Sequence, residues 1–207
     1  MDGADCIGSE ITMTTSKLST ASFSDYATRM QEVLSRSDWS GVAQLGQAMR
    51  ECWVAGHQVF FCGNGGSAGN AIHLANDYLY GIAKRTGGGM RVSSLSANAA
   101  VITCLANDVG YDSIYSEQLA VQAQTGDLLI VLSGSGNSPN ILKVLEQAKL
   151  MDVTSCAILG YTGGKAKALA DIPIHFDVND MQIAEDMQLV VGHMIMQWLY
   201  ENQPVAE

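Results

Sequence analysis

The chain has 207 residues, of which 47% are hydrophobic and 15% charged. This length suits one domain, and the composition supplies enough apolar surface for a packed core, which excludes a disordered chain. Twenty-one acidic residues against 11 basic ones give a formal charge of −10. Such a charge repels nucleic acids and anionic membrane surfaces. We therefore expect neither nucleic acid nor a membrane as a partner.

The cysteines and the first 20 residues indicate a cytoplasmic protein. The five cysteines are odd in number, scattered and never in a C-x-x-C arrangement, which argues against disulfides and thiolate zinc sites. No apolar run approaches the roughly 20 residues that span a bilayer, and the N-terminus has no export-signal pattern. Residues 1–20 are small and polar, so we expect a disordered tail ahead of a single domain at 21–207.

The first part of that domain, residues 24–57, shows apolar residues at helical spacing. Ser24 is a candidate N-cap, and a break near 37–41 divides the segment into two helices. Residues 58–200 form the predicted α/β core, which begins with a strand at 58–62, a glycine-rich loop and a helix over 71–79.

The strand, loop and helix pattern then repeats along the chain. Such alternation is typical of parallel sheets with helices on both faces, so we predict an α/β fold. The further elements are strands at 127–132, 154–159 and 172–177, an additional strand at 90–95, and helices at 141–148, 165–170 and 185–200.

Two loops rich in glycine and serine follow strands and open helices. The first runs from Gly63 to Ser67, and the second places Ser133, Ser135 and Ser138 within six residues. A helix N-terminus with free N–H groups, close backbone approach and hydroxyl donors makes an anion site. A lone loop of this kind is more often a tight turn with capping serines. Because both loops share the design, we favour phosphate binding, although neither matches a nucleotide-binding signature.

Two helices carry paired ionisable residues on one face. His73 and Asp77 are four residues apart, and Glu185 and His193 are eight apart. If the pairs converge, they form either a divalent metal site or an acid/base pair. Spacing alone equally allows a core histidine, a solvated aspartate and a glutamate that favours a helix N-terminus, so the alternatives stay open at this point.

Several stretches considered jointly decide between these readings. They are Cys62–Ser67 with His73-x-x-x-Asp77, Leu105–Asp108 with Gly110-Tyr111, Ser133–Asn140, Gly163-Gly164-Lys165 with Ala170-Asp171, and Glu185-Asp186-x-Gln188 with His193. Together these stretches resemble the sugar isomerase (SIS) domain and, within it, the phosphoheptose isomerases, over roughly residues 25–200.

This resemblance implies a flavodoxin-like three-layer αβα sandwich with a central parallel sheet. It also implies a cytoplasmic homotetramer in which the N-terminal helices pack between subunits and the active sites lie at subunit junctions. The implied reaction is isomerisation of sedoheptulose 7-phosphate to D-glycero-D-manno-heptose 7-phosphate through an enediol, in heptose nucleotide and cell-surface carbohydrate biosynthesis.

The resemblance also implies roles for individual residues. Asp77 and His193 would be the catalytic base and acid, and one Zn²⁺ per subunit would be bound by His73, Asp77, Glu185 and His193. The remaining residues would bind substrate, namely Ser67, Ser133, Ser135 and Ser138 with Gly65, Gly66 and Gly134 at the phosphate, and Asn64, Asn107, Asp108 and Glu185 at the sugar.

The chain departs from the better-known enterobacterial-type enzymes at three positions. Asp77 replaces a glutamate base, Glu185 replaces a metal-site glutamine, and Gln182 replaces an aspartate. The extra carboxylate favours a divalent cation. The departures leave two further hypotheses: an isomerase or sensor for another phosphosugar, and a non-catalytic tetrameric SIS protein that binds a partner in replication initiation.

Overall fold

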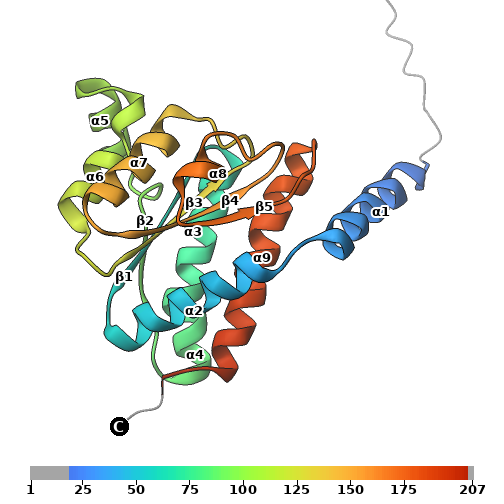
Figure 1. Cartoon of the computed structure of the whole chain (residues 1–207), viewed down its shortest axis with the longest axis horizontal. Helices are drawn as coiled ribbons and strands as arrows, with labels where there is room; N and C mark the ends of the chain where they lie inside the picture. The colour runs from blue at the N-terminus through green and yellow to red at the C-terminus, as the bar shows by residue number, and fades with distance from the viewer. Residues whose placement is uncertain (1–18, 205–207) are drawn as a thin grey trace, which may run out of the picture.

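The computed structural model describes residues 19–204, so all but the last two residues of the expected tail at 1–20 lie outside the described residues. At the centre is a five-stranded parallel sheet in the order β2-β1-β3-β4-β5 (Figure 1). Its strands are β1 (Gln58–Gly63), β2 (Arg91–Ser94), β3 (Leu128–Ser133), β4 (Thr154–Leu159) and β5 (Ile172–His175).

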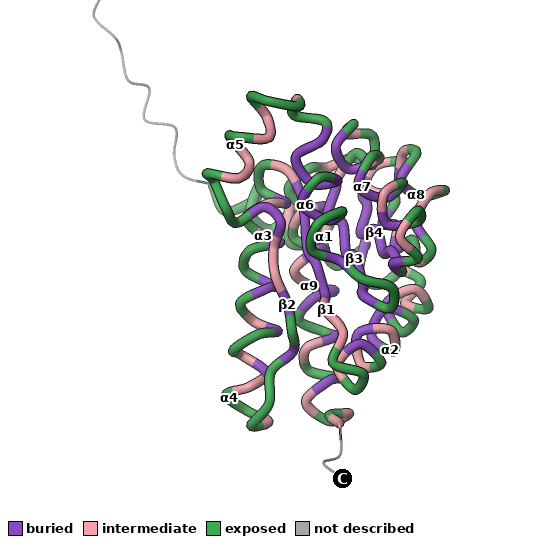
Figure 2. Tube along the Cα trace, turned by 90° about the vertical axis from the view of Figure 1, so that its left-hand side faces the viewer, coloured by how far each residue is buried: buried purple, intermediate pink, exposed green. Residues whose placement is uncertain are grey.

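The middle strands are continuous apolar runs because helices cover both of their faces. Every residue of β3 is buried, and β3 pairs with β1 from Val59↔Leu128 to Gly63↔Leu132. Figure 2 shows the buried trace concentrated on β1, β3 and β4. A strand buried on both faces is typical of a parallel sheet inside an α/β sandwich.

Two hydrophobic clusters lie on opposite faces of the sheet. One contains the buried side chains of α2 (Ser40–Ala55), α3 (Gly66–Asn76), α4 (Ile82–Thr86) and α9 (Met181–Glu201). The other contains those of α6 (Ser116–Gln122), α7 (Pro139–Leu150) and α8 (Ala166–Leu169). Three layers with this strand order are the flavodoxin-like arrangement. The predicted fold class is therefore confirmed.

Helix α1 (Ala21–Arg36) extends away from the rest of the molecule (Figure 1). Val33 is its only buried residue, and Arg29 joins the helix to the domain through an ion pair with Asp180. The predicted cap at Ser24 is wrong, because the helix begins at Ala21 and the Ser24 amide already donates to the Thr20 carbonyl. The predicted break is confirmed by the gap before α2.

The sequence patterns missed the elements between β2 and β3 and one irregular turn. The missed elements are α5 (Ala99–Asp108), the 3-10 turn η2 (Tyr111–Ser113) and α6. Helix α5 is apolar, yet no residue of it is buried. The irregular turn is the π-helical segment η1 (Asp77–Gly81), which interrupts the helix between α3 and α4. Segments of this kind occur often at functional sites.

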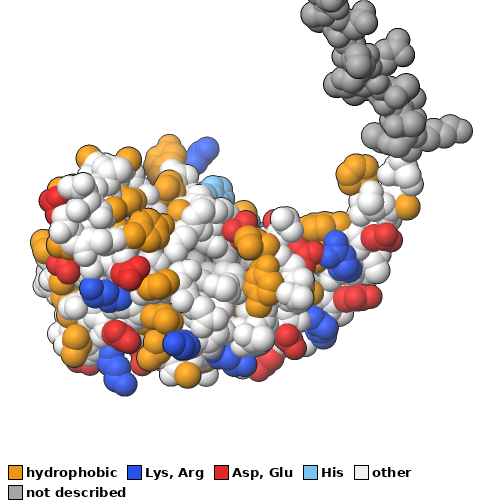
Figure 3. Space-filling view, turned by 90° about the horizontal axis from the view of Figure 1, so that it is seen from above, with side chains coloured by type: hydrophobic (Ala, Val, Ile, Leu, Met, Phe, Trp, Pro, Cys, Tyr) orange, Lys and Arg blue, Asp and Glu red, His pale blue; other side chains and the backbone are white. Residues whose placement is uncertain are grey.

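The surface carries no single dominant charge on the face shown in Figure 3, where acidic and basic side chains are interspersed. None of the helices within residues 19–204 is both long and apolar enough to span a bilayer. Four cysteines in the same range are free thiols: Cys52, Cys62, Cys104 and Cys156.

Candidate functional site

The polar site lies where the sheet order diverges. From β1 the chain continues to β2 on one side, and β3 lies on the other. In open parallel sheets, ligands bind at the carboxyl ends of strands beside such a switch point. The loops that leave β1 and β3 there enclose a cavity of about 310 Å³, lined by Asn64, Ser67, Leu132, Ser133, Gly134, Ser135, Ser138, Tyr161, Met181 and Glu185.

Two helices begin at this cavity. Gly65 precedes α3 with φ +57°, and Ser138 precedes α7, whose first residue is Pro139. A positive φ suits glycine, and proline at the first helical position has no N–H to leave unpaired. The free N–H groups and the dipoles of both helices therefore favour an anion in the cavity.

The cavity's hydroxyl groups are arranged to donate. The Ser133 Oγ accepts a hydrogen bond from the Gly136 amide at 3.1 Å, and the Ser135 Oγ accepts one from the Asn137 amide at 3.3 Å. An oxygen that accepts from the loop keeps its own hydrogen for a ligand. The lining residues, all within the described part of the chain, include no lysine or arginine, so the cavity offers an anion neutral donors.

Asn64 connects the two loops. Its amide forms a reciprocal pair with the buried Asn140, with Asn64 Nδ2 to Asn140 Oδ1 at 2.8 Å and Asn140 Nδ2 to Asn64 Oδ1 at 2.9 Å. The Tyr111 hydroxyl also donates to Asn64 Oδ1, and the Tyr115 hydroxyl, which donates to the Gly63 carbonyl, lies 3.3 Å from the same oxygen. Burial raises the pKa of Tyr115 to about 12, so this phenol remains a donor at neutral pH. One Nδ2 hydrogen of Asn64 is left for a ligand.

Glu185 lies in this cavity and not with the histidines. Its carboxylate lies directly against Gly66, where any Cβ would overlap it. Glycine at position 66 therefore lets the first turn of α3 approach α9. Among residues 19–204, the group with metal-ligating atoms close together contains three residues and omits Glu185. In this structure α9 directs the Glu185 side chain to the serines, about two turns before His193, so its predicted metal role stays a prediction.

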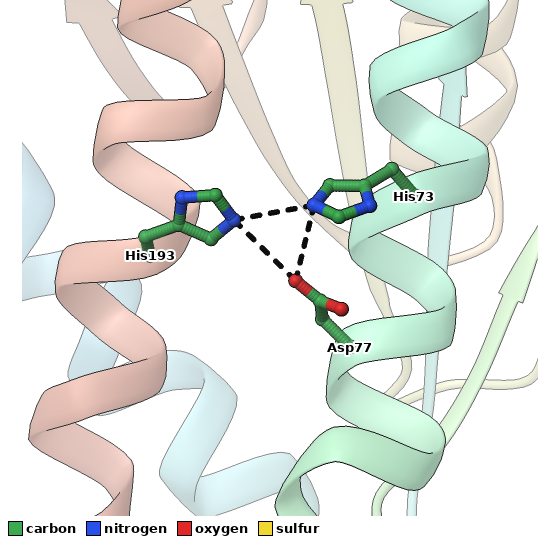
Figure 4. Close-up of side chains that lie close together, drawn as sticks. All are labelled: His73, Asp77 and His193. Atoms are coloured by element: carbon green, nitrogen blue, oxygen red, sulfur yellow. Dashed lines mark hydrogen bonds and ion pairs between the residues drawn. The ribbon is translucent and has the colours of Figure 1, made fainter.

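The structure brings His73, Asp77 and His193 together between α3 and α9 (Figure 4). The Asp77 Oδ2 lies 3.2 Å from the His73 Nε2 and 3.4 Å from the His193 Nε2. The two Nε2 atoms are 3.2 Å apart. Both imidazoles are about half exposed, whereas Asp77 is 18% exposed. The three polar atoms thus form a nearly equilateral triangle open to a small molecule.

This triangle fits a zinc ion. Ligand atoms about 2.0–2.1 Å from a tetrahedral zinc lie about 3.3–3.4 Å from one another, close to the three distances in this group. Two imidazoles and one carboxylate are a donor set found in catalytic zinc sites, which keep a fourth position open for water or substrate. The same three groups can also exchange protons directly, because each lies within reach of the other two.

Asn107 and Asp108 do not reach the cavity within one chain. Both are exposed at the end of α5, where the Asn107 amide donates to the neighbouring Asp108 carboxylate at 2.8 Å. The geometry of a single subunit therefore does not support their predicted contact with a sugar. Since no residue of α5 is fully buried and both side chains are exposed, a contact made across a subunit junction stays a prediction.

Sequence reasoning missed Tyr161, Met181 and Asn140 at this site. Tyr161 follows β4 with φ +45°, and the His175 ring contacts its carbonyl at 2.8 Å. Its position directly after a predicted strand was a usable signal, since the other lining loops also follow strands. Met181 gave no such signal, because its place depends on the packing of α9. Asn140 lies in the Ser133–Asn140 stretch, but its contact with Asn64 depends on how the two loops pack together.

Comparison with known proteins identifies the family of this chain. Residues 22–160, from α1 to the end of β4, match the SIS domain family model. A phosphoheptose isomerase from Akkermansia muciniphila is 35% identical over 154 residues, which cover 74% of this chain and 81% of that protein. The chain therefore belongs to the SIS domain family and, within it, to the phosphoheptose isomerase group.

Solved structures show the same fold. The phosphoheptose isomerase from Francisella tularensis superposes with a TM-score of 0.81 at 24% identity, covering 87% of this chain and 96% of that one. The phosphoheptose isomerase GmhA from Neisseria gonorrhoeae gives 0.78 at 25% identity, covering 88% and 96%. The similarity thus extends over nearly the whole length of both proteins.

Proposed function

We propose that this protein interconverts sedoheptulose 7-phosphate and D-glycero-D-manno-heptose 7-phosphate. The observation that carries the proposal is that the anion cavity and the His–Asp–His group lie along the same pair of helices: Ser67 of α3 and Glu185 of α9 line the cavity, and His73 of α3, Asp77 of η1 and His193 of α9 form the group. The phosphoheptose isomerases to which this chain is similar support the same reaction. The heptose phosphates would serve heptose nucleotide and cell-surface carbohydrate synthesis.

The serine cavity would hold the phosphate. A phosphate ester carries about −1.5 to −2 charge at neutral pH, and the start of α7 with the hydroxyls of Ser133, Ser135 and Ser138 supplies donors on one side of the cavity. Ser67 and the start of α3 supply donors on the other side. Glu185 accepts hydrogen bonds, so we assign it to sugar hydroxyls and not to the phosphate.

The spacing along the helices suits a long substrate. His73 is six residues after Ser67 on α3, and His193 is eight residues after Glu185 on α9. At a rise of 1.5 Å per residue, the two histidines lie roughly 9–12 Å along the helices from Ser67 and Glu185 in the cavity. This separation is comparable to the length of an open-chain seven-carbon sugar from its terminal phosphate to its carbonyl end.

Asp77 and His193 would move the protons. The Asp77 carboxylate removes a proton from C1 of the ketose while the His193 imidazolium gives one to the C2 oxygen, which yields an enediol. The carboxylic acid then returns the proton to C2, and the imidazole takes the proton of the C1 hydroxyl, so that an aldehyde forms. Each group ends in its starting protonation state. Their 3.4 Å separation lets both groups reach adjacent atoms of one substrate.

We also propose Zn²⁺ as the cofactor, one per subunit, held by His73, Asp77 and His193. When bound, the ion would act as a Lewis acid that polarises the carbonyl, and it would take over the role of the His193 imidazolium, since an imidazole that ligates zinc through Nε2 has no proton to give there. Support comes from the triangle of donor atoms described above. The Asp77 Oδ2 faces the imidazoles, and its Oδ1 lies 3.4 Å from the Asn76 amide nitrogen, on the other side of the carboxylate.

The test follows sedoheptulose 7-phosphate in D₂O by proton NMR with zinc-loaded protein. We expect solvent deuterium at the exchanging carbon and formation of the aldose, and a chelator should slow both by about tenfold or more. Exchange with a different ketose phosphate only would indicate another phosphosugar isomerase. No exchange with any ketose phosphate would indicate a non-catalytic SIS protein.

Ser135→Ala tests the phosphate contact. We expect KM to rise by about tenfold, the usual effect of losing one hydrogen bond to a charged group, with kcat nearly unchanged, because the phosphate is held alike in substrate and transition state. Steady-state kinetics of the variant measure both constants. Thr125→Val, at the opposite end of the sheet, removes a hydroxyl as a control. An unchanged KM in the Ser135 variant would contradict phosphate binding by this hydroxyl.

We further propose a cytoplasmic homotetramer in which the N-terminal helices pack between subunits. An apolar groove of about 600 Å³ runs between α2 and α9, where Trp39, Met194 and Trp198 line it. The extended α1 and the unburied α5 offer further apolar surface for contact. Free thiols are typical of reducing compartments, which supports the cytoplasm.

A further inference from the structure

Gln188, on the buried face of α9, contacts the cavity-lining residue Ser67 from the protein interior. It is 1% exposed and does not line the cavity, but its Nε2 donates to the Ser67 Oγ at 2.9 Å. Its Oε1 accepts from the Asn70 Nδ2 at 3.0 Å. Ser67 is itself buried at the cavity wall. A buried amide therefore connects α9 to Ser67, one of the proposed phosphate ligands.

The orientation of this amide is fixed by a backbone group. The Asn70 Nδ2 also donates to the Glu185 carbonyl at 3.0 Å, and a carbonyl oxygen can only accept. The Asn70 atom at this position must therefore be the nitrogen, so the Gln188 atom that faces it must be the oxygen. The Gln188 nitrogen consequently faces Ser67, and the Ser67 oxygen must accept.

We infer that Gln188 is a positioning residue that makes Ser67 a hydrogen-bond donor to the anion in the cavity. Because the Ser67 oxygen accepts from Gln188, its hydrogen is turned elsewhere. Within residues 19–204 this hydroxyl donates to no protein group. Ser133 and Ser135 accept from backbone amides to the same effect. Gln188 thus orients the hydroxyl at the start of α3 in the way that the loop backbone amides orient the hydroxyls before α7. The inference rests on the proposed phosphate site.

The inference predicts different results for two replacements of Gln188. Gln188→Glu puts an acceptor where the donor was, so the Ser67 hydroxyl turns to the carboxylate and away from the cavity. We expect affinity for inorganic phosphate, measured by calorimetry at pH 8, to fall about tenfold or more, as expected for Ser67→Ala. Gln188→Met removes the donor without adding an acceptor and leaves the hydroxyl free to rotate among three positions, so affinity should fall at most about threefold.

A double-variant cycle separates reorientation from the added charge. In the Ser67→Ala background there is no hydroxyl to turn, so Gln188→Glu should cost only the repulsion between carboxylate and phosphate. With the sugar phosphate as substrate, the single Gln188→Glu variant should raise KM and leave kcat nearly unchanged. If this variant does not fold, Asn70→Asp replaces it, because an acceptor at position 70 reverses the Gln188 amide and hence the Ser67 hydroxyl.

The outcomes distinguish the inference from the proposed function. Equal losses of affinity in Gln188→Glu and Gln188→Met, or an undiminished loss in the Ser67→Ala background, would overturn the positioning role and leave the phosphate site standing. Unchanged phosphate affinity in Ser67→Ala would overturn the role of Ser67 in the phosphate site and with it the inference. A large loss only in Gln188→Glu, which mostly disappears without the Ser67 hydroxyl, supports both.

Discussion

Replacing His193 by glutamine should lower kcat by about 10²- to 10⁴-fold, the usual effect of removing a general acid. The imidazole contacts both Asp77 and His73, so the change removes a proton donor and a candidate zinc ligand together. We therefore expect the zinc content of the purified variant to fall with the activity. Elemental analysis and steady-state kinetics on one preparation measure both effects.

His57→Gln is the matched control for this variant. His57 precedes β1 at the amino end of the strands, near Asp127, whereas the cavity lies at the carboxyl end. The control should keep both zinc and activity. Full zinc content and wild-type kcat in the His193 variant would show that this histidine has only a structural role.

Asp77→Asn should reduce kcat by a similar factor of about 10²–10⁴, because the amide is isosteric but cannot accept the proton from carbon. Asp77 supplies the only carboxylate of the three-residue group found in residues 19–204. Deuterium exchange at the substrate carbon should disappear with turnover, since both need the same proton abstraction. Proton NMR in D₂O measures the exchange directly.

Two further variants bracket the Asp77 result. Asp77→Glu keeps the carboxylate and introduces the glutamate that the better-known enterobacterial-type enzymes have at this position. It should retain more activity than the asparagine variant. Asp152→Asn changes an exposed aspartate just after α7 and should have no effect. Wild-type exchange in Asp77→Asn would assign the base to another residue, with Glu185 the next carboxylate to test.

The sheet and its loops were predictable because their signals are local. The strand β4 has the bounds that its apolar run predicted, and the glycine and serine loops lie at the carboxyl ends of β1 and β3 as alternation requires. His73, Asp77 and His193 converge as their spacing on two helices allowed. Helix α5 was not predicted, because it is apolar along most of its length and only Ile102, Leu105 and Ala106 pack partly against the core, so the helix shows little contrast between an apolar and a polar face.

The contacts in the site that could not be predicted from the sequence depend on tertiary packing. Glu185 and His193 share a face of α9 by spacing, yet about two turns separate them. The packing of α3 against α9 places Glu185 beside Gly66 and His193 beside Asp77. Gln188 belongs to the closing-helix stretch that resembles the SIS domain, but its contact with Ser67 follows from the same packing. The Asn64–Asn140 pair likewise joins residues 76 positions apart.

Neutral phosphate donors have a consequence for product release. Substrate and product of the proposed reaction are isomers with the same phosphate, so any attraction to that group retains the product as strongly as it captures the substrate. Arginine adds a full positive charge and two parallel hydrogen bonds to phosphate, which together bind it more strongly than a neutral hydroxyl does. A cavity that relies on serines and helix ends therefore limits the affinity for both isomers, which lets the product leave and the next molecule enter.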